Sequence, residues 1–204
     1  MNLKGKERIL QSAKQLISEK GIQHASVREI SKSAGVTTGA IYHHYKNKEE
    51  ILYEVMDISL NESHKILKEY SNDKNVKFEY MNSDILDNVL ECFVDRFEKE
   101  SENKIQLYLT VLGIEGNEEI KNKMIDKYNT WIIDVAKLLP LTYKDIPLSK
   151  VNALSSVLLA TIDGLILQSL IGVNTANNSD IIEVYELLLK KVIPEVINNL
   201  KENI

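Results

Sequence analysis

A short polar and aromatic set near residue 40 has the types and spacing needed to contact DNA bases. Thr38, Gly39, Tyr42 and His43 recur where one face of a short helix presents them. Hydroxyl and imidazole groups hydrogen-bond to base edges, and Gly39 with Ala40 keeps the helix thin enough to enter a major groove. The pattern therefore predicts that these four residues read bases.

Cationic and hydroxyl side chains flank this set. Lys48 is expected at a helix N-terminus, pointing outward toward a phosphate, and Lys46 precedes it. Arg28 and Thr37 are further candidates for phosphate contacts. A basic surface around a groove-reading helix is typical of DNA binding, because phosphate contacts supply most of the affinity.

Two helices and a tight turn are predicted to position these groups. Ser26 and Glu29 have capping-box spacing, so a helix begins there. Gly35 follows Ala34 where a left-handed residue ends the helix, and Thr37 or Thr38 caps the next one.

Apolar spacing predicts the buried side of this second helix and the start of a third. Ile41 and Tyr45 recur at i and i+4 on the inner side, where His44 is expected to pack beside Tyr45. The diverging pair His43 and His44 makes a poor metal site. Asn47, with Glu50 as its box partner, is expected to cap a long helix that runs to about Tyr70.

This combination resembles the TetR family of transcriptional regulators. The matching residues are Ser26, Ile30, Ala34-Gly35-Val36, Gly39-Ala40, Ile41-Tyr42-His43-His44-Tyr45 and Lys46-Asn47-Lys48-Glu49-Glu50-Ile51. Ser31 and Tyr45 replace the usual Ala and Phe, and the resemblance is dense over residues 7 to 55. It implies a homodimer that binds a near-palindromic operator, together with a body whose small-molecule pocket controls DNA release.

Candidate pocket residues lie on the middle helices of that body. They are the aromatic residues Phe93, Phe97, Tyr108, Tyr128 and Trp131, with His64, Gln106 and Asp163 as polar anchors. Aromatic residues at helical spacing are more often ordinary core, and the ligand itself is not readable from the sequence.

The most apolar run, Leu154 to Val173, has the length of a membrane span. Asp163, Gln168 and several hydroxyl residues interrupt it, which disfavours a membrane. A second subunit is the better partner for a helix that is apolar on two sides. The expected dimer residues are Leu158, Ile162, Leu165, Tyr185, Leu188 and Val192, and Pro194 is expected to bend the last helix or interrupt its hydrogen bonds.

Charge is divided unevenly along the 204 residues, whose net charge is −5. Residues 1–50 hold nine Lys or Arg against five Glu, a local balance of +4, which leaves −9 for the remainder. A basic head and an acidic body orient the approach to DNA. The single cysteine, Cys92, lies in an apolar stretch and is expected to be buried, which excludes an internal disulfide. No signal segment is recognised, so a cytoplasmic location is expected.

Helical periodicity without strand alternation predicts an all-α protein. Residues 1–50 are expected to form the helix-turn-helix domain, with the linking helix starting in it, and residues 51–204 the ligand-binding and dimerisation domain. Helices are expected at 7–20, 82–99, 104–113, 117–138, 149–172 and 180–200, with breaks at Ser71–Lys77, Glu100–Lys104, Gly113–Gly116 and Pro140–Pro147.

Other function classes are less well supported. No phosphate-binding glycine loop, metal-ligand motif or nucleophile elbow is recognised, so neither an enzyme nor a cofactor is predicted. A ligand-independent architectural DNA-binding protein stays open, and the head does not distinguish a repressor from an activator.

Overall fold

The computed structural model describes residues 3–63, 83–173 and 175–202, and within them it contains helices and no β-strand. The all-α prediction is therefore confirmed. Two compact units divide the chain: unit 1 is Met1–Glu62 with Lys99–Ile125, and unit 2 is Ser63–Glu98 with Asp126–Ile204. The boundary expected at residue 50 does not coincide with these units, because a segment far along the chain packs with the N-terminal helices.

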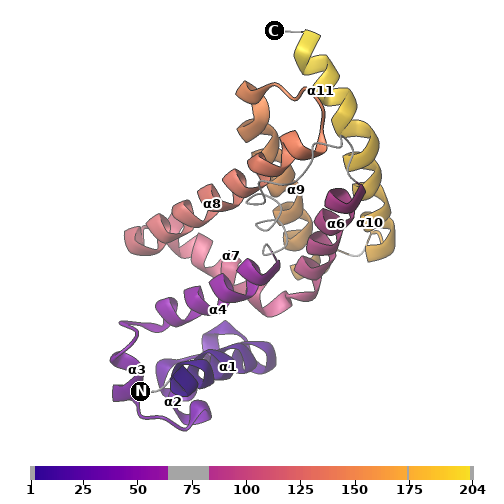
Figure 1. Ribbon diagram of the computed structural model, residues 1–204. Coiled ribbons are helices and arrows are strands. Elements are labelled where there is room, and N and C mark those ends of the chain that lie inside the picture. Colours follow the sequence, from indigo (N-terminus) through magenta and orange to yellow (C-terminus); the bar gives the residue numbers. More distant parts are fainter. Residues whose placement is uncertain (1–2, 64–82, 174, 203–204) are drawn as a thin grey trace. The chain divides into compact units, whose positions relative to one another are not determined.

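Unit 1 contains the N-terminal helices α1 (Leu3–Lys20), α2 (Val27–Ala34), α3 (Thr38–Tyr42) and α4 (Lys48–Ser63), followed later in the chain by α7 (Glu100–Ile114) and the start of α8 (Glu118–Thr142). Figure 1 shows α1, α2 and α3 clustered together. Their shared core includes Ile9, Ile17, Ile30 and Ile41, all fully buried. These are the inward positions of the predicted helical pattern, and their burial stabilises the helix-turn-helix.

The break expected at Glu100–Lys104 is wrong, since α7 begins at Glu100 and only Lys99 separates it from α6 (Ser83–Glu98). Glu100 and Glu102 occupy the first turn of α7, where carboxylates interact favourably with the helix dipole. Glu102 is almost fully buried and lies 2.6 Å from the Lys14 ammonium on α1. This ion pair joins α7 to the N-terminal helices.

The turn between α7 and α8 is tight. A Cβ added at Gly113 would lie 3.0 Å from Lys121 Cα, so the two helices approach too closely there for a larger residue. Asn117 then caps α8 by accepting a hydrogen bond from the Ile120 amide at 3.1 Å. The expected interruption at Pro140 is displaced, because α8 continues through that proline to Thr142.

Unit 2 contains α6, the rest of α8, α9 (Val151–Leu170), α10 (Asn178–Leu187) and α11 (Ile193–Glu202), with the short helices η2 (Leu148–Lys150) and η3 (Leu188–Val192). Helix α6 packs against both α9 and α10. The core of unit 2 is a cluster of Leu, Ile and Val side chains with Phe93, Tyr143 and Tyr185.

A widened turn joins α10 to α11. Residues Leu188–Val192 form a π-helical turn just before Pro194. Proline has no N–H to donate to the Lys190 carbonyl four residues earlier, so the regular α-helical ladder is interrupted there as predicted. The Tyr143 hydroxyl donates to the Leu189 carbonyl of this turn at 2.9 Å.

One segment, Leu148–Leu170, is long and apolar enough to cross a membrane by length and composition, and 28% of its most apolar window is buried. Its buried residues, among them Leu154, Leu158 and Ile166, belong to the core of unit 2. The rest of this helix is open to a further partner.

Candidate nucleic-acid interface and ligand cavity

The turn between α2 and α3 is built by local hydrogen bonds. The Ser26 hydroxyl accepts from the Glu29 amide at 3.2 Å and begins α2. Gly35 ends it in the left-handed region, at φ 61° and ψ 39°. The Arg8 guanidinium donates to the Ala34 carbonyl, and a Cβ on Gly35 would lie 2.6 Å from Arg8 Nη2. Both the backbone conformation and this close approach therefore favour glycine.

Helix α3 presents the predicted base-reading residues to solvent. Thr37, rather than Thr38, is the cap, because its hydroxyl accepts from the Ala40 amide at 3.1 Å. Ile41 is the only residue of α3 that is buried. Thr38, Gly39 and His43 are exposed, and the Tyr42 side chain is 58% exposed. Tyr42 is therefore not part of the core of this chain, and a large aromatic side chain so exposed is suited to contact with a partner.

His44 differs from the expectation that it packs inward. It is exposed, and its ring meets the edge of His43 at a centroid distance of 5.0 Å. Helix α3 ends at Tyr42, so residues 43–46 no longer follow the helical spacing on which that expectation depended.

Tyr45 is buried on the inner side as predicted. Its hydroxyl donates to Glu54 at 2.9 Å, and the Lys6 ammonium pairs with the same carboxylate at 2.6 Å. Burial, then the hydrogen bond to Glu54, raises the pKa of the Tyr45 phenol. This polar contact links α4 to α1 and holds the chain just after the reading helix.

The start of α4 is a reciprocal cap. The Asn47 side chain accepts from the Glu50 amide at 3.0 Å, and the Glu50 carboxylate accepts from the Lys46 amide at 2.7 Å. The backbone hydrogen bond from Lys46, followed by the charge of Lys123, lowers the pKa of Glu50. The predicted cap by Asn47 is confirmed. The Glu50 carboxylate accepts from the backbone amide of Lys46, whereas a standard capping box would use the backbone amide of Asn47.

The prediction that Lys48 points outward is wrong. Its ammonium lies 5.2 Å from the Tyr108 ring centroid on α7 and 3.5 Å from the Ile22 carbonyl. The Tyr108 ring attracts this cation, which is why the charge turns toward α7. Lys46 is exposed with its ammonium 3.7 Å from Glu119, and Arg28 is exposed at the start of α2. Arg28 and Lys46 are thus more exposed than Lys48.

Tyr108 and Gln106, both expected in a ligand pocket, lie in unit 1 instead. The Tyr108 hydroxyl donates to Glu49 at 3.1 Å, and burial with this bond raises the pKa of Tyr108 to about 12. Gln106 is buried on α7. Aromatic spacing along α7 carried no information about which unit the helix joins. His64, the third of these candidates, lies outside the described residues.

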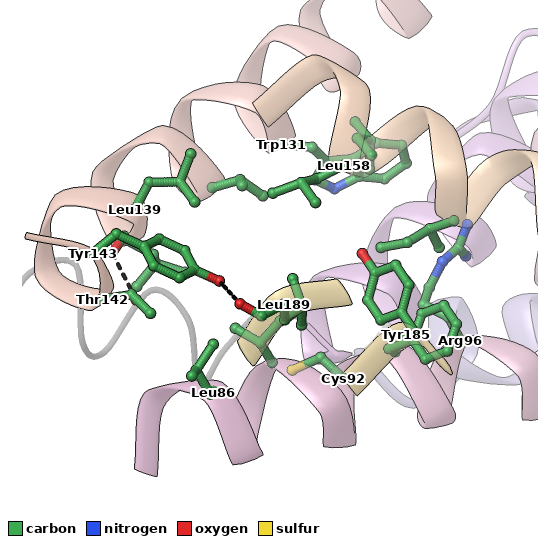
Figure 2. A pocket seen from close by; sticks show the side chains of 16 residues that line it. Leu86, Cys92, Arg96, Trp131, Leu139, Thr142, Tyr143, Leu158, Tyr185 and Leu189 are labelled. Carbon is green, nitrogen blue, oxygen red and sulfur yellow. Dashed lines mark hydrogen bonds between the residues drawn. The ribbon is translucent and has the colours of Figure 1, made fainter. Parts of the chain in front are cut away.

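Unit 2 encloses a cavity with a mostly apolar wall (Figure 2). The apolar lining residues are Leu86, Val89, Cys92, Phe93, Trp131, Val135, Leu138, Leu139, Leu158, Leu159, Ile162 and Leu189, and the polar ones are Arg96, Thr142, Tyr143 and Tyr185. Phe93 and Trp131 are therefore in the wall, as the sequence predicted.

Three other predicted pocket residues lie just behind the wall. Phe97 meets Phe93 edge to face at 5.0 Å between centroids. Tyr128 lies edge to face with Trp131 at 5.3 Å, and its hydroxyl donates to Asp163 at 2.9 Å. They position lining residues without themselves lining the cavity.

Sequence reasoning missed Arg96 and Tyr143 and misplaced three lining residues. Leu158, Ile162 and Tyr185 were expected at a dimer interface, yet all three line the cavity. Burial raises the pKa of the Tyr143 and Tyr185 phenols. Arg96 lies four residues after Cys92 on the apolar stripe of α6, and a charge on a buried stripe is the signal that identifies it.

Unit 2 exposes large apolar side chains to solvent. Among the described residues they are Ile133, Leu148, Val157, Leu167, Ile171, Val173, Val184, Leu187, Val192 and Val196. Of the predicted set, Val192 is exposed, while Leu165 and Leu188 are partly buried and border an open groove between α9 and α10. The dimer face itself stays a prediction.

Comparison with known proteins gives matches of two kinds. The family model described as bacterial regulatory proteins of the tetR family matches residues 9–55. The transcriptional regulator AcrR of Shigella flexneri is 43% identical over 54 residues, which span 26% of this chain and 25% of that regulator. The sequence match is thus confined to about a quarter of each protein.

Solved structures match over nearly the whole fold. A transcriptional regulator from a Rhodococcus species superposes with a TM-score of 0.68 at 19% identity, covering 90% of this chain and 93% of that one. A transcriptional regulator from Aquifex aeolicus has a TM-score of 0.63 at 24% identity, with coverage of 94% and 99%. At these identities the likeness concerns the arrangement of helices.

Proposed function

Since this chain belongs to the TetR family of transcriptional regulators, we propose that it is a homodimeric repressor that binds a near-palindromic operator and is released by a small molecule. The observation that carries the DNA-binding part is helix α3, whose Tyr42 ring is 58% exposed between a capped turn and the α4 cap. A large aromatic residue held rigidly in water is suited to contact with a groove. Such a regulator acts in the cytoplasm, where its DNA is.

Two chains are needed to place two reading helices in successive major grooves. The exposed apolar residues of α9 and α10, with the groove between them, offer a surface for a second copy of the chain. Gly164 borders this groove, and a Cβ added there meets nothing within 4 Å of its own chain. Close packing against another helix is therefore sterically open at this point.

The enclosed cavity favours ligand control over an architectural role. An architectural protein has no use for a cavity in an otherwise packed core, because a cavity lowers stability. Occupation of the cavity changes DNA affinity only if the ligand binds the DNA-released conformation more tightly than the DNA-bound one.

The test of DNA binding is a footprint of the purified protein on the DNA around its own gene. Tyr42→Ala is expected to weaken binding at least about tenfold while leaving the thermal unfolding midpoint unchanged. Leu148→Ala, at an 80% exposed apolar residue of unit 2, is the matched control and is expected to bind normally. The proposal would be contradicted if no footprint formed and DNA affinity did not change with salt concentration.

Transcription in vitro from the footprinted promoter separates repressor from activator. A repressor lowers transcript yield when its site overlaps the polymerase site, and increased yield would show an activator.

Sedimentation at micromolar concentration tests the dimer. Val184→Glu places a charge on the exposed face of α10 and is expected to give monomers. Ile114→Glu, at a 78% exposed residue of unit 1, is the control that is expected to stay dimeric. A monomeric parent protein would refute the homodimer.

A further inference from the structure

We propose that the cavity of unit 2 takes an apolar molecule with one anionic end group, an alkyl carboxylate, whose charge lies against Arg96. The inference rests on the proposed function only in treating this cavity as the effector site. The binding claim itself concerns unit 2 and is measured without DNA.

The chemistry of the wall differs between its two ends. Figure 2 shows Arg96 beside Tyr185 at one end and Tyr143 with Thr142 at the other. Tyr185 is stacked on Phe93, with 4.1 Å between the ring centroids, and the rest of the wall is formed mostly by leucine side chains and Trp131. A ligand that fills the middle must therefore be apolar, since polar groups there would lose their hydration without compensation.

The hydroxyl groups at the far end already donate within the protein. Thr142 donates to the Leu138 carbonyl at 3.0 Å, and Tyr143 donates to the Leu189 carbonyl at 2.9 Å. Ligand polarity is consequently less favoured at that end. The end with Arg96 is the place for a polar group.

Arg96 is 6% exposed and is the only charged residue in the cavity wall among the described residues. A guanidinium carries donors alone, in a planar fork that matches a carboxylate. Asp163 lies 3.8 Å from Arg96 through Oδ1, while its Oδ2 accepts from Tyr128. This is longer than the separation of about 2.8 Å that a strong charged hydrogen bond has. Asp163 thus moderates the buried charge, and a ligand carboxylate competes with it for the guanidinium.

A second cation lies behind the same wall. Lys127 is buried, with its ammonium 5.4 Å from the Trp131 ring centroid. A cationic ligand entering the cavity would face Arg96 directly, and repulsion between like charges is strong where water is excluded. The negative net charge of the chain therefore does not predict a cationic ligand, because the charges next to the cavity determine which ligand charge is favoured.

The size of the cavity is compatible with a ligand. The centres of water-sized spheres can occupy about 80 Å³ of it. One water needs about 10–15 Å³ by this measure, so the cavity has room for more than one water-sized group.

Trp131 supplies the measurement, since it is the single tryptophan of the chain and lines the cavity. Its fluorescence is titrated with decanoate, decanol and decyltrimethylammonium, which share a ten-carbon chain and differ in head-group charge. Decanoate is expected to bind at least about tenfold more tightly than either of the others, because Arg96 can form a charge-assisted bidentate pair with a carboxylate but only a neutral hydrogen bond with an alcohol.

Two substitutions test the role of Arg96 in opposite directions. Arg96→Met keeps the length of the side chain and is expected to weaken decanoate about tenfold or more while decanol binding is retained. Asp163→Asn removes the competing carboxylate and is expected to tighten decanoate without affecting decanol. Leu158→Phe narrows the cavity and is the control expected to weaken both. If Arg96→Met does not fold, the decanoate affinity of Asp163→Asn still tests the role of Arg96.

Equal affinity for decanoate and decanol, tighter binding of the cation, or no response to Asp163→Asn would each overturn the proposal. Operator release is measured separately by the anisotropy of labelled DNA. Decanoate binding without release leaves the site established and contradicts only ligand control. Release without any change at Trp131 places the effector elsewhere and overturns the site.

Discussion

Substitution of Gly35 by alanine tests how the turn before the reading helix is held. Alanine at φ 61° and ψ 39° carries a backbone cost of about 1–2 kcal/mol. Its Cβ would also lie 2.6 Å from Arg8 Nη2, at the flexible end of that side chain. The arginine is expected to swing away, which loses its hydrogen bond to the Ala34 carbonyl at about 1 kcal/mol for a partly exposed charged donor. The expected total is about 2–3 kcal/mol.

A double-mutant cycle with Arg8→Met separates these two contributions. In the methionine background the hydrogen bond is already absent, so Gly35→Ala is expected to cost only the backbone term of about 1–2 kcal/mol. The two substitutions together should therefore cost about 1 kcal/mol less than the sum of their separate effects.

Hydrogen–deuterium exchange of peptides covering residues 27–42 is the suitable assay, because the only tryptophan lies in unit 2 and does not report on this turn. The Val36 amide, which donates to the Ser31 carbonyl at 3.0 Å, should exchange about 30 to 160 times faster in Gly35→Ala. Strict additivity in the cycle would refute the reasoning that Arg8 and Gly35 act through one contact.

Three further results are expected. A Cβ added at Gly39 would lie 3.9 Å from Thr37 Oγ1 and near no other atom, so Gly39→Ala should raise the free energy of unfolding by about 0.5–1 kcal/mol. Gly39→Leu should fold but lose operator binding in an anisotropy assay. Normal binding by Gly39→Leu would show that α3 does not enter a groove. Gly113→Ala should lower the free energy of unfolding by about 1–3 kcal/mol in urea titrations because Lys121 Cα is 3.0 Å away. Its control is Gly164→Ala inside helix α9, which meets nothing within 4 Å and should therefore raise the free energy of unfolding by about 0.5–1 kcal/mol. The pKa of Glu50 is lowered from 4.5, so its stabilisation is complete above that pH and is lost as the pH falls through the folded value. The stability difference between the parent protein and Glu50→Gln should therefore shrink as the pH falls below 4.5, and a constant difference in thermal melts would contradict the cap.

Local chemistry explains which parts could be predicted. Ser26, Gly35, Thr37 and Asn47 act within four residues of their own position, through caps and one left-handed backbone conformation. Such interactions depend only on residue type and local spacing. The helix-turn-helix and the exposed face of α3 can therefore be predicted from the sequence. The resemblance to a family over residues 7 to 55 has the same physical origin.

Contacts between distant segments decided the rest. Tyr108 has the sequence context of a pocket residue, yet α7 packs on the N-terminal helices and directs its hydroxyl to Glu49. Lys48 turns toward that ring because α7 is there. Helical periodicity identifies a buried face without naming the partner that buries it, so neither placement follows from spacing.

The cavity shows the same division. By itself the sequence determined an all-α chain, a capped reading helix and apolar stripes on the later helices. Only the tertiary structure decided that Leu158 and Tyr185 face a cavity, that Arg96 lies in its wall, and that the exposed apolar surface passes through Val157 and Val184. The physical reason is that α9 and α10 each carry apolar residues on more than one face, and the choice between core, cavity and partner depends on how all the helices pack together.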